Sequence, residues 1–216
     1  MTAGQSPLQW AAQERAAARR GVRRRILAWL GLNRAARRAD ALTARAAHGA
    51  VGEQQTAALL DRLPAGWTVF HGRRLPGRRH DLDHVLVSPC GTAVVVLDSK
   101  RWHFKRETKL VDGRVFCGEE DRHGQVEAVA GYAAAVQEVL GVPGLAVWPL
   151  LVVHGSAVRG GFLAAEVAGH SGPVWVLGPQ KLVPTLAGAP GGRDPRRAAA
   201  LTQLVAGRLP SAVSGA

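Results

Sequence analysis

Apolar residues recur along the chain with two different periods, and these periods predict strands and helices. Short apolar runs bounded by Gly, Pro and Asp predict strands at residues 67–71, 82–87, 92–98, 145–154 and 174–177. The second and third runs are almost continuously apolar, which is typical of strands covered on both faces of a sheet. Asp112-Gly113 lies between two further short apolar runs and is a strong signal for a two-residue hairpin turn.

Helical spacing of apolar residues predicts helices at residues 51–63, 125–140 and 196–209. Pro64 ends the first of these helices, and Gly141 ends the second. The chain thus runs through a helix, three strands, a hairpin, a second helix and a strand. This order predicts an α/β fold with a mixed central sheet flanked by helices.

Positive charge is concentrated at the N-terminal end of the chain. Lys and Arg number 28 against 16 Asp and Glu, which gives a net charge of +12. Residues 1–48 contain ten Arg, among them Arg23, Arg24 and Arg25, against two acids, so this segment carries +8 and the rest +4. A basic segment joined to a nearly balanced core suggests a polyanionic partner, with nucleic acid ahead of a membrane.

We divide the chain into a basic helical arm at residues 1–47, a core at 48–155, and a C-terminal strand and helix extension at 156–216 that packs on the core. Ala, Arg and Leu without Pro favour helix in the arm. Three roles remain open for it: a nucleic-acid clamp, a solvated helix, or an amphipathic helix at a membrane surface. As a solvated helix, it would pack Trp29-Leu30-Leu32 on the core or on a second protomer, forming a homodimer.

Compartment signals are mostly negative. The two cysteines, Cys90 and Cys117, form no CxxC pair, so neither a disulfide framework nor a zinc site is indicated. No apolar run approaches the roughly 18 residues of a membrane span. We therefore expect a cytoplasmic protein.

Candidate catalytic residues lie on the two central strands. Asp83 begins one apolar strand, and Asp98-Ser99-Lys100 ends the next. Side chains alternate along a strand, so Asp98 and Lys100 share a face while Ser99 points away. The short turn makes the strands antiparallel neighbours, which brings Asp83 close to Asp98. Two carboxylates beside a lysine suit a divalent cation and an attacked phosphate, but a structural ion pair of Lys100 with one aspartate explains the same residues.

Glu53 is a third candidate acid, at the start of the first predicted core helix. It lies one turn before the apolar stripe of this helix and can point back over the sheet. A glutamate in a first helical turn also stabilises the helix dipole without any catalytic role. Spacing alone leaves both interpretations open.

His84 is adjacent to Asp83 in sequence and therefore points to the opposite face of its strand. We expect it to be a hydrogen-bonded core residue rather than a participant in the chemistry. The other histidines singled out, at positions 71, 103, 123 and 154, have no metal-ligand spacing.

An ordered set of motifs occurs between His48 and His154. The set comprises Gly52-Glu53, Leu63-Pro64-Ala65-Gly66-Trp67, Leu82-Asp83-His84, Pro89-x-Gly91 and Asp98-Ser99-Lys100 with Trp102. It resembles the nuclease-related domain (NERD) family, which is grouped with the PD-(D/E)xK nucleases. The resemblance implies a restriction-endonuclease-like core and covers roughly half of the chain.

The resemblance implies a role for each matching residue. Glu53 corresponds to the helix-borne acid, Asp83 to the acid of the first strand, and Asp98 to the acid of the second strand. Lys100 corresponds to the motif lysine. Gln125, at the head of the second core helix, resembles a glutamine that some of these nucleases place near the metal or the phosphate.

A site of this kind implies a hard divalent cation, Mg²⁺ or in its place Mn²⁺. Such cations prefer oxygen ligands, and the protein would supply them from Glu53, Asp83, Asp98 and the Ser99 carbonyl group. Lys100 would orient the attacking water or offset charge in the transition state.

Basic and aromatic residues near these acids are candidate contacts to nucleic acid. Besides the arm, they are Arg73, Arg74, Arg78 and Arg79 of a basic loop predicted at residues 72–79, together with Arg101 and Trp102. Trp102 can stack on a base or pack in the core. His80-Asp81 and His103-Phe104 depart from the family pattern, which more often has a small or amide residue at the first place and a glycine at the second. These departures bear on substrate contacts more than on chemistry.

The sequence therefore predicts a metal-dependent nuclease that hydrolyses phosphodiester bonds, with DNA ahead of RNA as the substrate. The alternative is a catalytically silent nucleic-acid-binding module of the same fold. A protein-interaction domain would leave the charges on the central strands unexplained.

Overall fold

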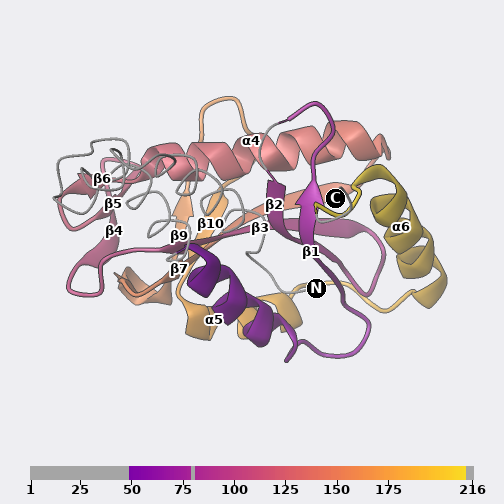
Figure 1. Cartoon of the computed structure of the whole chain (residues 1–216), viewed down its shortest axis with the longest axis horizontal. Coiled ribbons are helices and arrows are strands. Elements are labelled where there is room, and N and C mark those ends of the chain that lie inside the picture. Colours follow the sequence, from indigo (N-terminus) through magenta and orange to yellow (C-terminus); the bar gives the residue numbers. More distant parts are fainter. Residues whose placement is uncertain (1–48, 79–80, 213–216) are drawn as a thin grey trace, which may run out of the picture.

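The computed structural model describes residues 49–78 and 81–212, and a six-stranded mixed sheet organises them (Figure 1). The strand order is β1-β2-β3-β7-β10-β9. β3 runs antiparallel to β2 and parallel to β7, so the strand that carries Asp98 and Lys100 lies inside the sheet. The bounds are Thr68–Arg74 (β1), Asp81–Val87 (β2), Ala93–Arg101 (β3), Ala146–His154 (β7), Phe162–Ala165 (β9) and Val174–Leu177 (β10).

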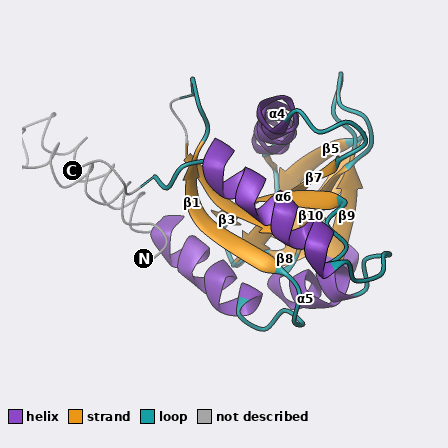
Figure 2. Ribbon diagram, turned by 90° about the vertical axis from the view of Figure 1, so that its right-hand side faces the viewer, coloured by secondary structure: helices purple, strands orange, loops and turns teal. Residues whose placement is uncertain are grey.

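Helices cover both faces of this sheet (Figure 2). α4 and α6 pack on one face, whereas α5 and a helix at residues 49–60 pack on the other. Alternate residues of β3 therefore enter different cores: Val94 and Val96 pack with α4 and α6, while Val95 and Leu97 pack with the opposite pair. The bounds of the labelled helices are His123–Leu140 (α4), Pro179–Ala187 (α5) and Pro195–Arg208 (α6).

A second, four-stranded sheet follows β3 in the chain, with the order β6-β5-β4-β8. Its hairpin turns at Asp112 and Gly113, whose φ angles of 49° and 77° match the tight turn that the sequence predicts. The bounds are Glu107–Val111 (β4), Arg114–Cys117 (β5), Glu120–Asp121 (β6) and Ala157–Val158 (β8).

The predicted fold class is confirmed, since the described chain is a mixed sheet flanked by helices. All five predicted strands of the central sheet are present. The long apolar runs of β2 and β3 are buried between the two helical layers, as their composition predicts. The helix predicted at residues 125–140 begins two residues earlier, at His123, and ends at Gly141 in the left-handed conformation.

The basic loop predicted at residues 72–79 is wrong in its first part, because β1 continues to Arg74. The C-terminal tail extends the pairing there: Arg73 forms a bridge with Ser211, and the Arg74 amide donates to the Pro210 carbonyl oxygen. A partner more than a hundred residues away gives no local sequence signal, so the loop prediction ended the strand too early.

Residues after His154 complete the central sheet rather than only covering it, since β10 pairs with β7 and β9 pairs with β10. The predicted arm at residues 1–47 lies outside the described residues. Among the helices described, none has the length and apolarity that crossing a bilayer requires.

Candidate active site

Asp83 and Asp98 lie opposite each other at the point where β2 and β3 separate. The register pairs Val85 with Val96 and His84 with Leu97, so the next step sets Asp83 against Asp98. Residues directly opposite in an antiparallel pair point to the same face. Val85 and Val96 both lie in the core under α4, so both aspartates project on the α4 side of the sheet. The backbone register therefore places Asp83 and Asp98 side by side, as the sequence predicts.

The two strands diverge beyond this point, and Asp83 fills the gap. The Ser99 amide donates to the Asp83 carboxylate over 2.8 Å, in place of a β2 carbonyl group. β3 continues to Arg101 paired with β7. The segment that carries Ser99 and Lys100 is thus held on one side by a strand and on the other by a carboxylate.

Lys100 forms an ion pair with Asp98 on the same face of β3, as strand alternation predicts. The Asp98 side chain is 11% exposed and the Lys100 side chain 36% exposed, so the pair is largely withdrawn from solvent. Burial lowers the pKa of Lys100, but the neighbouring charges of Asp98 and Asp83 outweigh burial and raise the pKa above its usual value. Lys100 is therefore a fixed cation at neutral pH.

The acids nearby are not fully neutralised by this lysine. Burial raises the pKa of Asp83 well above its usual range, and the like charges of Asp98 and Glu53 raise it further, against Lys100 and the Ser99 amide. Burial also raises the pKa of Glu53, and Asp98 adds to this shift while Lys100 opposes it. We call Glu53, Asp83 and Asp98 the acidic set. These shifts mean that the helix at residues 49–60 and the two strands bring their acids within electrostatic reach of one another.

Tyr132 is a neighbour of the acidic set that the sequence interpretation missed. This residue of α4 is half-buried, and burial together with the charge of Asp98 raises the pKa of its phenol. It is the single tyrosine of the chain and lies two helical turns after Gln125. Its helical spacing from Gln125 was therefore the one sequence signal that placed Tyr132 on the same face of α4 as Gln125.

A buried chain of hydrogen bonds lies on the opposite face of β3. The Ser99 hydroxyl donates to Thr56 Oγ1 over 2.8 Å, and Thr56 Oγ1 lies 2.7 Å from His154 Nε2. Thr56 Oγ1 accepts from Ser99 and shares a second hydrogen bond with His154 Nε2, whose direction depends on the tautomer of the imidazole. Burial and Arg101 lower the pKa of His154, which favours the neutral ring. Thr56 lies one turn after Glu53, so these bonds fix the acid-bearing helix to β3.

His84 is a fully buried core residue that faces away from Asp83, as predicted. Its Nδ1 atom lies 2.8 Å from Nδ1 of His71, so one ring donates and the other accepts. Burial lowers the pKa of His84 to about 3, and His71 contributes to this shift. Both rings are therefore uncharged at neutral pH.

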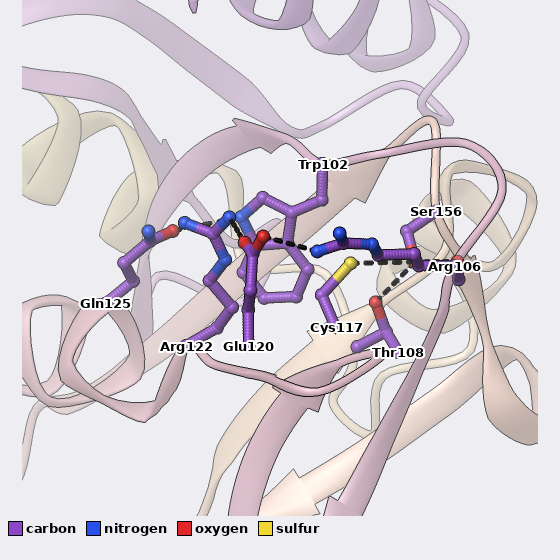
Figure 3. Close-up of polar contacts among 8 residues, drawn as sticks. All are labelled: Trp102, Arg106, Thr108, Cys117, Glu120, Arg122, Gln125 and Ser156. Atoms are coloured by element: carbon purple, nitrogen blue, oxygen red, sulfur yellow. Dashed lines mark hydrogen bonds and ion pairs between the residues drawn. The ribbon is translucent and has the colours of Figure 1, made fainter.

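Gln125 and Trp102, for which the sequence left two roles open, contact each other through their side chains (Figure 3). The indole N–H of Trp102 donates to the side-chain Oε1 of Gln125 over 3.0 Å. Trp102 is 6% exposed and lies in the core with Val126 and Val153. Core packing is thus favoured over base stacking for Trp102, and Gln125 is turned toward this indole.

The arginines expected to contact nucleic acid have different surroundings. Arg73 donates to the Leu209 carbonyl oxygen and lies 4.4 Å from the Phe70 ring centroid, and Arg74 donates to the Ala212 carbonyl oxygen. These two arginines hold the C-terminal tail. Arg78 and Arg101 are exposed. Arg79 and the arm residues Arg23, Arg24 and Arg25 lie outside the described residues.

The donor chemistry of the acidic set fits a hard divalent cation, because its carboxylate oxygens are hard ligands and burial raises the pKa values of Asp83 and Glu53 despite the charge of Lys100. The present side-chain positions do not form a ligand shell: no three His, Cys, Asp or Glu of the described residues are gathered to hold a metal ion. Asp98 contacts Lys100 and Asp83 contacts the Ser99 amide instead.

Comparison with protein families identifies the class. The model of the nuclease-related domain family matches residues 48–154, about half of the chain, and these residues span the acidic set, Lys100 and Gln125. The chain belongs to the nuclease-related domain family, an assignment with which the PD-(D/E)xK superfamily is consistent. No curated protein and no solved structure matches the chain.

Proposed function

We propose that this protein is a metal-dependent nuclease that hydrolyses phosphodiester bonds, with DNA ahead of RNA as its substrate. One observation carries the proposal: a buried Asp98–Lys100 pair lies opposite Asp83, and Asp83 and Glu53 have raised pKa values despite the lysine beside them. Such uncompensated acid is costly in a purely structural site and is common where charge is needed for chemistry.

The residues of the chain divide the work by their positions. Lys100 is a cation on a buried strand with a partly exposed side chain, so it can hold a phosphate oxygen and offset negative charge that develops during hydrolysis. Asp98 orients that lysine. The Ser99–Thr56–His154 chain keeps the Glu53 helix in register with β3.

Mg²⁺, or Mn²⁺ in its place, would be held by Glu53, Asp83, Asp98 and the Ser99 carbonyl oxygen. A bound divalent cation polarises a phosphoryl oxygen and lowers the pKa of a bound water. The raised pKa values support this proposal, since a cation among these carboxyl groups favours their ionised forms.

The test is a cleavage assay on labelled single-stranded, duplex and branched DNA and on RNA, with Mg²⁺ or with EDTA. We expect cleavage with the metal and none with EDTA. Asp98→Asn should abolish it, whereas Asp61→Asn, at an exposed aspartate, should leave it unchanged. Cleavage that survives in a folded Asp98→Asn protein would reject the proposed site.

A catalytically silent binding module is the second candidate. The direct contact of Asp98 with Lys100, and the lack of a gathered three-ligand group among the described residues, favour it. This candidate predicts that nucleic acid binds equally well with Mg²⁺ and with EDTA and is not cleaved in either condition.

A further inference from the structure

Phe104 is an exposed aromatic residue that follows the catalytic strand directly. Its exposed fraction of 71% is the largest among the large hydrophobic residues in the described part of the chain. It lies four positions after Lys100, in the turn that joins β3 to β4. A single exposed apolar residue is common at protein surfaces, so the surroundings of Phe104 decide whether it has a role.

The turn that presents Phe104 is anchored on both sides. Before it, Trp102 is buried and its amide donates to the His154 carbonyl oxygen over 2.9 Å. A Cβ atom at Gly155 would lie only 2.4 Å from the Trp102 carbonyl oxygen, so the backbones pack closely there. After the turn, the Ser156 hydroxyl donates to the Arg106 carbonyl oxygen over 2.6 Å. The exposure of Phe104 is therefore not that of a loose loop.

Contacts inside the turn organise an aromatic pair. The Arg106 amide donates to the His103 carbonyl oxygen, and the Lys105 amide donates to His103 Nδ1 over 3.2 Å. These bonds hold the imidazole against Phe104, with ring centroids 5.3 Å apart and planes 7° from parallel. The two stacked rings thus present a preorganised aromatic face, and preorganisation reduces the entropy lost on binding.

Positive charge lies beside this ring pair at Lys105 and, three positions before Phe104 in the chain, at Arg101. Lys105 Nζ lies 5.6 Å from the Phe104 ring centroid, and Arg101 is exposed at the end of β3. In the described part of the chain neither residue forms an ion pair, in contrast to Arg106, which pairs with Glu120. A ligand that suits this surface has a flat aromatic part and a negatively charged part.

We infer that His103 and Phe104 form a stacking platform for a nucleobase of single-stranded or frayed nucleic acid, with Lys105 and Arg101 holding the adjoining phosphates. This inference rests on the proposed function and names the form of its substrate. At most about 14 Å separates the Cα atoms of Lys100 and Phe104. The stacked base therefore lies within about four nucleotides of the phosphate at Lys100.

The platform takes the role that the sequence left open for Trp102. Bases stack on aromatic rings whatever their identity, so the platform favours unpaired strands over closed duplex without a strong sequence preference. A duplex with stacked bases offers no free face to Phe104, except at a frayed end or a branch.

The test measures binding by the full chain in EDTA, where cleavage does not interfere. The probes are single-stranded oligonucleotides with 2-aminopurine at successive positions and the matching duplex. A salt concentration of roughly 200 mM limits non-specific contacts by the arginines of residues 1–48. Stacking quenches 2-aminopurine, so one titration gives both the affinity and the stacked position.

We expect Phe104→Ala to weaken single-strand binding about tenfold and to remove the quench. Phe104→Tyr should preserve both, and Phe104→Leu should lose the quench. Phe162→Ala is the matched control, since Phe162 is 51% exposed on the edge strand β9. Unchanged affinity and quench in Phe104→Ala, or no single-strand binding by the unaltered protein, would overturn the platform.

The platform and the nuclease proposal fail in different ways. Binding and quenching that depend on Phe104, without cleavage in Mg²⁺, support the platform and reject the nuclease. Cleavage that needs Asp98, with no effect of Phe104→Ala on binding, supports the nuclease and rejects the platform.

Discussion

Two groups of charged residues lie on neighbouring parts of the chain and behave in opposite ways. The acidic set at β2 and β3 is largely buried, and the pKa values of Asp83 and Glu53 are raised. The ion pairs of the small sheet are exposed, and their acids have lowered pKa values. These hairpin ion pairs are Arg159–Glu107, Arg106–Glu120, Arg122–Glu120 and Arg114–Asp121.

The difference comes from partners and solvent rather than from residue type. A hydrogen bond from Arg159 lowers the pKa of Glu107, and a hydrogen bond from Arg106 lowers that of Glu120. Backbone and arginine donors do the same for Asp121. In the acidic set, burial and mutual repulsion exceed what Lys100 supplies. The acidic set has more carboxyl groups than neighbouring cations. This excess separates a candidate active site from a structural ion pair.

The largest effect that separates the two groups is expected at Lys100. Lys100→Ala should reduce metal-dependent cleavage by about a hundredfold or more, because it removes the cation that offsets transition-state charge. Lys109→Ala on β4 is the matched control and should leave cleavage unchanged. Circular dichroism and the unfolding midpoint check that each variant folds. Equal losses in both variants would remove the distinction between the two groups.

The pH dependence of stability should come from the buried histidines and not from the hairpin ion pairs. The pKa of His84 is about 3 in the folded protein and about 6.5 when unfolded, so below about pH 6.5 only the unfolded chain gains this proton. His84 should therefore lower stability by about 2 kcal/mol between about pH 7 and pH 5, while the raised pKa values of Asp83 and Glu53 act in the opposite direction. The lowered pKa values of Glu107, Glu120 and Asp121 affect stability only at lower pH, where these acids become protonated and the hairpin ion pairs are lost.

Urea unfolding at several pH values measures this slope. His84→Asn keeps a polar atom near the position of Nδ1 and removes the titrating ring, so it should flatten the slope between these pH values. An unchanged slope in this variant would assign the pH dependence to other groups.

A smaller effect is expected at Thr56, which links the acidic set to the core. Thr56→Val removes the hydroxyl between Ser99 and His154 and leaves both buried partners unsatisfied, which costs about 1–3 kcal/mol of stability. It should also lower cleavage, though less than Lys100→Ala does. Thr56→Ser keeps the hydroxyl and should restore both properties. If Val and Ser behave alike, the hydrogen-bond chain does not hold the helix.

The smallest effect is expected at the hairpin ion pairs. Exposed pairs are screened by water and contribute little to stability. Arg159→Ala should therefore leave both the thermal unfolding midpoint and cleavage unchanged within error. A clear drop in cleavage would show that the small sheet belongs to the active site after all.

The sequence predicts well what depends on nearby residues. Strand alternation and a short turn were enough to bring Asp83, Asp98 and Lys100 together, because both rules act within about twenty residues. The Asp112-Gly113 hairpin follows from local backbone preference in the same way.

Features that depend on distant partners were not predictable. Thr56 and His154 are 98 positions apart in the sequence, and no periodic pattern predicts their contact. The burial of Trp102 and the exposure of Phe104 depend on how residues 154–156 pack against the turn. The sequence shows that His103-Phe104 departs from the family pattern. Only the fold shows that Trp102 is buried and Phe104 is exposed.

The position of β3 between β2 and β7 has a consequence for the order of events during synthesis. Glu53, Asp83, Asp98 and Lys100 all leave the ribosome before residues 146–154, whose strand completes the sheet beside them. Until that strand arrives, β3 has an open edge and Thr56 lacks its histidine. β3 is thus the last part of the candidate site to become rigid, so the acidic set and Lys100 are held in place only after residues 146–154 have been made.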